Sequence, residues 1–236
     1  MTGPGATLAI ELSQRAGSVA LRPRPGAPID ECEVPPSDDR GDHLMERIAS
    51  LFDRHGLAPR DLSTIAVSVG PGGFTGLRVA CATAKALADV VGCRVVAVPS
   101  SLVAAREALR SGAWRASEGA RATVVTASKG SDAWRSIVRS EGEMPVEIAA
   151  GLAPAAAGVD GPLLADGHSL AAWAPVAAQG ALEARWTATA CLEVGERLAR
   201  QEAASEDPQR LTPTYPRPPE AVSLWEARQA GAHRSG

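Results

Sequence analysis

The sequence predicts an α/β protein in two parts, and three observations support this prediction. In the first 110 residues, short apolar runs typical of strands alternate with longer runs of helical periodicity. A polar, glycine-containing stretch at 111–121 follows, and shorter apolar runs then resume. The length of 236 residues suffices for two small domains with cores of their own. We therefore expect units at 1–110 and 111–205, and a partly disordered C-terminal segment at 206–236.

The first unit is expected to begin with two short strands at 8–11 and 17–22, joined by a polar turn. Residues 23–41 are rich in Pro, Asp and Arg, which predicts an irregular exposed connection with at most one weak strand. A helix over 43–55 should follow, because Asp42 can cap it and its apolar residues recur at helical spacing.

The remaining elements are read from apolar runs between turn signals. The first unit continues with a strand at 64–69, a helix at 76–91, a strand at 94–98 and a helix at 101–109. In the second half of the sequence, the apolar runs predict strands at 122–126, 133–139 and 145–148, a strand ending in a turn at 163–167, and a helix at 187–200.

One glycine-rich stretch joins the strand at 64–69 to the helix after it. Its glycines allow a sharp turn and a close approach from outside, and Thr75 is expected to cap the helix. Such a corner can hold an anion at the helix N-terminus or pack tightly against another part of the chain. It is not a P-loop, because Lys is absent from its Thr75-Gly76-Leu77 ending. The residues that shape this glycine corner are Gly70, Gly72, Gly73, Thr75 and Arg78.

Composition excludes several classes of protein. The net charge of −3 argues against a protein that grips nucleic acid by itself, because phosphate contacts need dense Lys and Arg. The 4 cysteines are scattered and form no CxxC pair, so a zinc site or a disulfide framework is not expected. No apolar run is long enough to span a membrane, and no signal peptide is seen. A cytoplasmic protein is therefore expected.

Neither a metal site nor a catalytic constellation is predicted. His43 and His55 lie twelve apart on the predicted helix at 43–55, and position 47, where a metal-binding pair would need its second histidine, is Arg47. No nucleophile with an adjacent base and no pair of carboxylates for acid–base work can be assembled from the sequence motifs.

The sequence around the glycine corner resembles the signature of the TsaB (YeaZ) family. The resemblance covers most of residues 6–110 and is thin beyond them. It implies an actin-like ATPase fold with two ribonuclease H-like lobes. The matching segments are Leu8-Ala9-Ile10-Glu11-Leu12-Ser13, Gly17-Ser18-Val19-Ala20-Leu21, Gly70-Pro71-Gly72-Gly73-Phe74-Thr75-Gly76-Leu77-Arg78, Ala82-Thr83-Ala84-Lys85-Ala86-Leu87-Ala88 and Val98-Pro99-Ser100-Ser101-Leu102.

This resemblance implies a noncatalytic partner in the modification of tRNA to N6-threonylcarbamoyladenosine at position 37. In that pathway a TsaD-type subunit transfers the threonylcarbamoyl group, a TsaE-type ATPase assists, and the TsaB subunit supports TsaD by direct contact. The implied chain is a homodimer when alone, reaches tRNA only through the complex, and needs no cofactor, although weak ATP or ADP binding is compatible with the fold.

Two departures from the family argue against nucleotide chemistry. Relatives usually carry Asp-Thr-Ser where this chain has Glu11-Leu12-Ser13, so a hydroxyl near the expected phosphates is replaced by Leu. Relatives also commonly carry Asp-Ala-Arg where this chain has Thr126-Ala127-Ser128. Two alternatives nevertheless stay open, which are a nucleotide-dependent phosphotransferase or ATPase acting alone and a peptidase-like homologue without a metal.

The helix at 76–91 is expected to be buried on two sides, because nearly all its residues are small or apolar. One side would face its own sheet and the other a partner subunit. In the TsaB family the corresponding region forms the association surface. The residues expected in the partner interface are Leu44, Ile48, Leu51, Leu77, Ala80, Cys81, Ala84 and Leu87.

Overall fold

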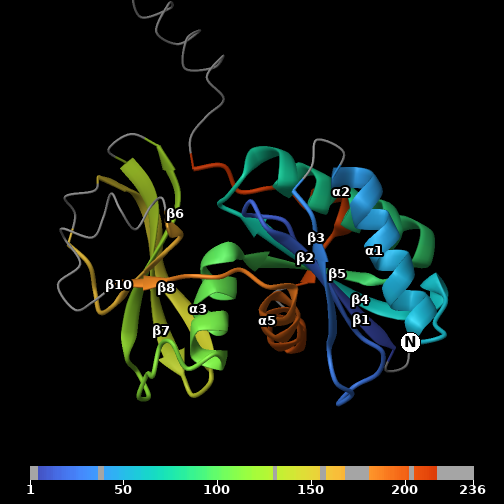
Figure 1. Cartoon of the computed structure of the whole chain (residues 1–236), viewed down its shortest axis with the longest axis horizontal. Helices are drawn as coiled ribbons and strands as arrows, with labels where there is room; N and C mark the ends of the chain where they lie inside the picture. The colour runs from blue at the N-terminus through green and yellow to red at the C-terminus, as the bar shows by residue number, and fades with distance from the viewer. Residues whose placement is uncertain are drawn as a thin grey trace, which may run out of the picture.

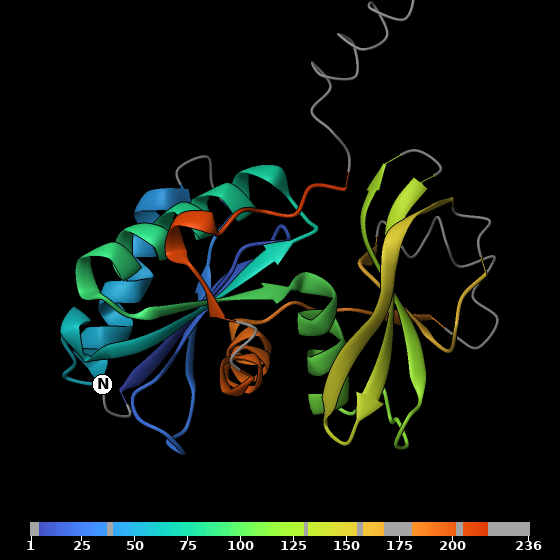
Figure 2. The same cartoon turned by 180° about the vertical axis from the view of Figure 1, so that it is seen from behind.

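The protein consists of two mixed β-sheets that enclose two helices, with two more helices on the outer face of the first sheet (Figures 1 and 2). A computed structural model describes residues 5–36, 40–129, 132–154, 158–167, 181–201 and 205–216. None of the helices in these ranges has the length and apolar character needed to cross a membrane.

The first sheet has the strand order β11-β5-β4-β1-β2-β3. Strands β1, β2 and β3 form an antiparallel meander, and β4 and β5 extend it in parallel to β1. Its strands are β1 (Ala6–Glu11), β2 (Gly17–Arg22), β3 (Asp30–Val34), β4 (Leu62–Gly70), β5 (Arg94–Pro99) and β11 (Ser205–Glu206).

The second sheet repeats this arrangement, with the strand order β10-β9-β6-β7-β8. Strands β6, β7 and β8 form the antiparallel meander, and β9 and β10 extend it in parallel to β6. Two copies of one topology confirm the predicted two-lobed actin-like fold. The strands are β6 (Arg121–Lys129), β7 (Asp132–Glu141), β8 (Met144–Pro154), β9 (Leu163–Ala165) and β10 (Ala181–Glu183).

Helices cover both faces of the first sheet. Helices α1 (Arg40–Arg54) and α2 (Phe74–Val91) lie side by side on its outer face, and α5 (Ala188–Arg200) covers its inner face (Figure 1). Helix α3 (Ser100–Arg110) follows the first sheet in sequence but packs on the second, between α5 and strand β8. Each lobe therefore contributes the helix that covers the other lobe's sheet.

Residue size along the central strands separates the two faces of the first sheet. Large side chains such as Leu8 and Ile65 point toward α1 and α2, whereas Ala9 and Ala66 belong to the cluster around α3 and α5. These alanines let α5 approach closely, since a Cβ added at Gly195 would lie 2.4 Å from the Cβ of Ala66. The strands are buried on both faces, which explains their nearly continuous apolar runs.

One of the hydrophobic clusters is shared by the two lobes. Side chains from β4, α3, β6, β7 and α5 form a single buried cluster between the sheets. Within it the indole N–H of Trp186 donates to the carbonyl of Ser100 at 2.9 Å, so the segment before α5 is tied to the start of α3. This continuous packing joins the lobes through their exchanged helices.

The structure corrects two predicted boundaries. The second unit was expected to span 111–205, but α5 lies within that range and packs on the first sheet, where β11 also pairs with β5. The C-terminal segment expected at 206–236 belongs to the first lobe as far as Pro216, because Leu211 enters its core and the Thr214 N–H donates to the Val69 carbonyl at 2.7 Å. Residues 217–236 lie outside the described residues.

Most predicted elements are present within a few residues of their expected ends, and two short strands were missed. The region at 23–41 was expected to be irregular with at most one weak strand, and β3 is a regular edge strand paired with β2 along its whole length. Strands β10 and β11 have only 3 and 2 residues, too short to give a periodic signal.

Candidate docking surface and inter-lobe cleft

The glycine corner is a packed turn between β4 and α2. The Gly73 N–H donates to the Ser13 carbonyl at 2.7 Å, and a Cβ added at Gly72 would lie 2.2 Å from that same oxygen. On the other side, the Ser100 hydroxyl donates to the Pro71 carbonyl at 2.6 Å. Of the two readings drawn from the sequence, these contacts support close packing, because the Gly73 N–H is already engaged within the chain.

The start of α2 differs from the prediction by two residues. Gly73, not Thr75, is the N-cap, and no side chain accepts a hydrogen bond from the first turn. Thr75 lies inside the helix and is exposed. Glycine is among the residues preferred at this position, so the sequence GGFT allows the helix to begin two residues earlier than a threonine cap would.

The residues expected in the partner interface have an internal packing role instead. All except Leu77 belong to or pack against the core between the first sheet and helices α1 and α2, and only Leu87 is partly exposed. Leu77 is fully buried beside Gly70. Side chains without accessible surface cannot contact a partner directly, so the surface available on these helices is made by other residues. The buried set is Leu44, Ile48, Leu51, Leu77, Ala80, Cys81 and Ala84.

The exposed face of α2 carries a row of residues at every fourth position, all of them apolar except one Arg. Rows at this spacing form the ridges by which one helix packs into the groove of another. Two of its members, Phe74 and Val90, are large apolar side chains that are 53% and 85% exposed. We call this row the docking ridge, and it consists of Phe74, Arg78, Ala82, Ala86 and Val90.

An aromatic and cationic cluster stands at the N-terminal end of the docking ridge. The rings of Phe74 and Tyr215 have centroids 5.1 Å apart, and the Arg78 guanidinium lies 4.6 Å from the centre of the Phe74 ring. Tyr215 is 39% exposed. Tyr and Arg are the side chains over-represented among residues that dominate binding energy at protein interfaces, so this cluster is the strongest candidate anchor on the surface.

The C-terminal segment covers the side of α2 next to the ridge. The short helix η4 (Pro208–Arg210) lies against it, and Gln209 donates to the Asp89 carboxylate at 2.9 Å. The Lys85 ammonium also donates to the Gln209 carbonyl at 3.3 Å. The segment thus pairs Lys85 and Asp89 of α2 and leaves the docking ridge exposed.

A second candidate site is a cavity of about 980 Å³ between the lobes. Its walls come from the turn between β1 and β2, the end of β3, and the chain that enters α5. Glu33 and Glu183 contribute exposed carboxylates, and Arg15 and Arg185 contribute guanidinium groups. Its volume would admit a small-molecule ligand.

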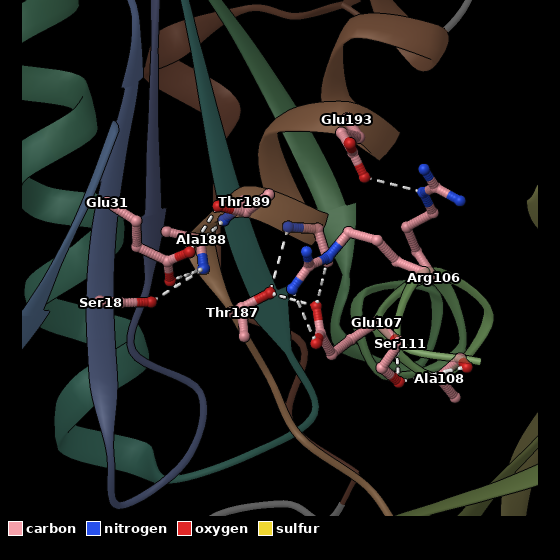
Figure 3. A network of polar contacts seen from close by, with 12 residues as sticks. Ser18, Glu31, Arg106, Glu107, Ala108, Ser111, Thr187, Ala188, Thr189 and Glu193 are labelled. Carbon is pink, nitrogen blue, oxygen red and sulfur yellow. Dashed lines mark hydrogen bonds and ion pairs between the residues drawn. The ribbon is translucent and has the colours of Figure 1, made fainter. Parts of the chain in front are cut away.

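The wall of this cavity contains the N-terminus of α5, where a carboxylate of the chain itself is bound (Figure 3). Glu31 accepts from the N–H groups of Ala188 and Thr189, and from the Thr189 hydroxyl. Ser18 adds a further acceptor for the Ala188 N–H at 2.8 Å. Because a helix N-terminus favours negative charge, Glu31 fills the position that an anion would otherwise occupy.

The same network extends to α3 through Thr187, the N-cap of α5. The Thr187 hydroxyl accepts from the Ala190 N–H and donates to the buried Glu107 carboxylate at 2.9 Å (Figure 3). Glu107 in turn accepts from the Arg110 guanidinium, which raises the pKa of Arg110. One turn earlier, Arg106 pairs with Glu193 at 2.8 Å. The beginning of α5 and the last turns of α3 are therefore held by charged groups.

Removing the Glu31 carboxylate is expected to lower the free energy of unfolding. Replacement of a helix-capping acceptor by Ala costs about 1–2 kcal/mol, and Glu31→Ala should fall in this range. Urea denaturation followed by circular dichroism would measure it. Glu33→Ala is the matched control, because Glu33 is exposed on the same strand. Equal stabilities of the two variants would contradict the capping role.

His55 and the Cys32 thiol lie near the C-terminal end of α1, whereas His43 lies near its N-terminal end. His55 and Arg54 both contact the Asp30 carboxylate, at 3.1 and 3.0 Å, and these bonds with the two side chains lower the pKa of Asp30 despite partial desolvation. Arg54 also donates to the Cys32 sulfur. His43 pairs with Glu46 at 3.5 Å. Within the described ranges, no three His, Cys, Asp or Glu side chains cluster in a way that could hold a metal ion.

Comparisons with known proteins point to one family. Residues 37–132, from the region before α1 to the start of β7, match the model of the family TsaD: tRNA N6-adenosine threonylcarbamoyltransferase. No curated protein sequence matches the chain significantly.

Two solved structures from Pseudomonas aeruginosa have a similar fold over almost the whole chain. One is YeaZ, with 20% sequence identity and a TM-score of 0.74, covering 89% of this chain and 100% of its own. The other is an uncharacterized protein with similarity to peptidase YeaZ, with 20% identity, a TM-score of 0.74, and coverage of 90% and 100%. The chain thus has a segment similar to the TsaD family model and the fold of the YeaZ structures, in agreement with the resemblance to the TsaB (YeaZ) family predicted from the sequence.

Proposed function

We propose that this protein is a noncatalytic partner subunit in the formation of N6-threonylcarbamoyladenosine at position 37 of tRNA. In this proposal it acts in the cytoplasm and docks to a TsaD-type catalytic subunit, with a TsaE-type ATPase as a further component. The observation that supports the docking role most strongly is the open ridge on α2, with two exposed large apolar side chains and an exposed Arg between them. A ridge of this kind gains free energy when a second helix covers it.

The polar sites of the chain favour a scaffold over an enzyme. The N-terminus of α5 faces the inter-lobe cavity but already holds the Glu31 carboxylate, which would repel the phosphates of a nucleotide. The glycine corner is engaged with Ser13. We therefore propose that no cofactor is required and that any ATP or ADP binding is weak.

The docking ridge can serve two complexes. A second copy of the chain could pair its ridge with the first in a homodimer, and the TsaD-type subunit would then compete for the same surface. Because the two uses exclude each other, addition of the catalytic subunit should convert homodimers into mixed complexes. tRNA would be reached through the catalytic subunit, in keeping with the net charge of −3 on this chain.

Size-exclusion chromatography with light scattering tests the proposal. The chain is run alone and mixed with the TsaD-type subunit of the same organism, with and without ATP. A mixed complex that forms with the wild type supports the proposal, and its absence under every nucleotide condition rejects it. In the same samples, nucleotide hydrolysis by the isolated chain would favour the alternative of a phosphotransferase acting alone.

A further inference from the structure

Glu11 is a fully buried residue at the end of β1, and its carboxyl group is connected to the glycine corner through Ser13. Its Oε1 accepts from the Ser13 N–H at 2.6 Å. Its Oε2 has no hydrogen-bond partner within the described part of the chain, and the same holds for the hydroxyls of Ser13 and Ser68, both 0% exposed. Buried polar atoms without partners are rare in folded proteins, so a group of three in one place calls for an explanation.

The Ser13 peptide connects this carboxyl to the glycine corner. Its N–H is held by Glu11, and its carbonyl accepts from the Gly73 N–H at 2.7 Å. The carbonyl also lies in direct contact with Gly72, where a Cβ would approach it to 2.2 Å. The Ser13 N–H is thus bonded to Glu11 and the Ser13 carbonyl to Gly73. Gly73 is the N-cap of α2.

We infer that Glu11 is a positioning residue that fixes the Ser13 peptide and, through it, the glycine corner and the first turn of α2. Phe74 directly follows Gly73, and Arg78, the other anchor residue of the docking ridge, lies about one turn further along α2. A shift of Ser13 would therefore be transmitted over two hydrogen bonds to the exposed cluster. The effect on docking rests on the function proposed above. The hydrogen bonds from Glu11 through Ser13 to Gly73 lie within this chain and do not depend on that function.

The surroundings of Glu11 favour its neutral form. Burial raises the pKa of this carboxyl above its usual 4.5, and the nearby Ser13 and Ser68 only partly oppose this effect. The other ionisable groups that act on it are Glu31 from β3 and Cys191 from α5, and a negative charge on either would repel a second one. A neutral carboxyl can hold Ser13 through Oε1 and donate its O–H to a serine hydroxyl, which a carboxylate cannot do.

The raised pKa has a defined consequence for stability. Because the folded protein holds this proton more tightly than the unfolded chain, the stabilisation is complete below about pH 4.5, the usual value for the unfolded carboxyl. It is lost progressively as the pH rises from there through the pKa of the folded state. The Ser13 N–H bond itself favours the carboxylate, so this loss of stability comes from burial of the charge and not from a weaker hold on Ser13.

Amide hydrogen exchange of the isolated chain tests the inference. The protection factor of the Gly73 amide is measured by NMR from about pH 5 to about pH 8 in the wild type, Glu11→Gln and Glu11→Leu. The wild type should keep its protection as the pH rises, because the Ser13 N–H bond also favours the carboxylate. Glu11→Gln keeps an acceptor for Ser13 and cannot ionise, so its protection should be independent of pH. Glu11→Leu should lose about tenfold in protection, as expected for one buried hydrogen bond.

A Gly73 protection factor that is unchanged in Glu11→Leu would overturn the inference. If Glu11→Leu does not fold, the Ser13 and Gly73 amides of the wild type decide, because they should open together with similar protection factors and unequal ones would overturn the inference. Glu33→Gln, which alters an exposed carboxylate, is the control for nonspecific charge effects and should follow the wild type. No partner is present in this experiment, so its outcome is independent of whether the chain binds a TsaD-type subunit.

Discussion

An Ala82→Arg variant should lose the complex with the TsaD-type subunit while keeping the stability of the wild type. Ala82 is exposed in the middle of the docking ridge, so an Arg there has room in the free chain. In the complex its charge would be buried against an apolar surface. A mismatched charge of this kind costs roughly 3 kcal/mol, which corresponds to about a 100-fold loss of affinity. Light scattering of the mixture and a thermal melt of the free variant would measure both effects.

Two further variants make this experiment specific. Ala149→Arg adds the same charge at an exposed position on β8, far from the ridge in sequence and on the other lobe, and should leave the complex intact. Ala84→Arg would place the charge at a position with 0% exposure and should unfold the chain rather than test an interface. Binding by Ala82→Arg at wild-type affinity would remove the ridge from the docking surface.

The anchor cluster predicts a finer pattern on the same surface. Phe74→Ala removes the ring that contacts both Tyr215 and Arg78, so it should weaken the complex more than Val90→Ala at the opposite end of the ridge. Truncation of an aromatic anchor typically costs at least about 2 kcal/mol of binding free energy, or about 30-fold in affinity.

The sequence predicted the architecture well because burial leaves a strong periodic signal. The central strands β1 and β4 are buried on both faces and appear as continuous apolar runs, and α5 has one clear apolar face with Thr187 as its cap. Strand β3 was expected at most as a weak strand, because it lies at the sheet edge, where Asp30, Glu31 and Glu33 give it a polar composition.

The sequence did not reveal which side of α2 is open. Nearly all its residues are small or apolar, so the pattern alone could not separate the face that contacts the first sheet from the face left open. The choice depends on two facts of tertiary structure, which are the position of the sheet and the return of the C-terminal segment over Asp89. Tyr215, about 140 residues after Phe74 in sequence, was likewise beyond the reach of local patterns.

The role of Glu11 was also hidden, although its departure from the family sequence was visible. Comparison with relatives suggested only a weaker phosphate site. Its actual surroundings depend on Ser68 and Cys191, which come from β4 and α5. Such a site is assembled by the fold and carries no spacing that a motif could describe.

A methyl group at Gly72 should destabilise the protein far more than one at Gly73. In Gly72→Ala the new Cβ would meet the Ser13 carbonyl oxygen at 2.2 Å, and this oxygen belongs to a backbone held by Glu11. Relief would require the turn between β1 and β2 to move away from the corner. Overpacking of this kind costs about 1–3 kcal/mol, and a rigid backbone obstacle favours the upper end. For a chain of this size that corresponds to a fall in Tm of roughly 4–10 °C.

Gly73→Ala is the matched control, because its Cβ would lie 3.6 Å from the same oxygen, an ordinary contact distance. Gly73 also has a φ of −64°, which any residue can adopt. The cost of this substitution should be limited to the loss of glycine at the N-cap, about 1 kcal/mol or less. Thermal melts of the two variants decide the matter. Comparable destabilisation of both would mean that the corner yields easily, and the packing of Ser13 against Gly72 would then not fix the start of α2.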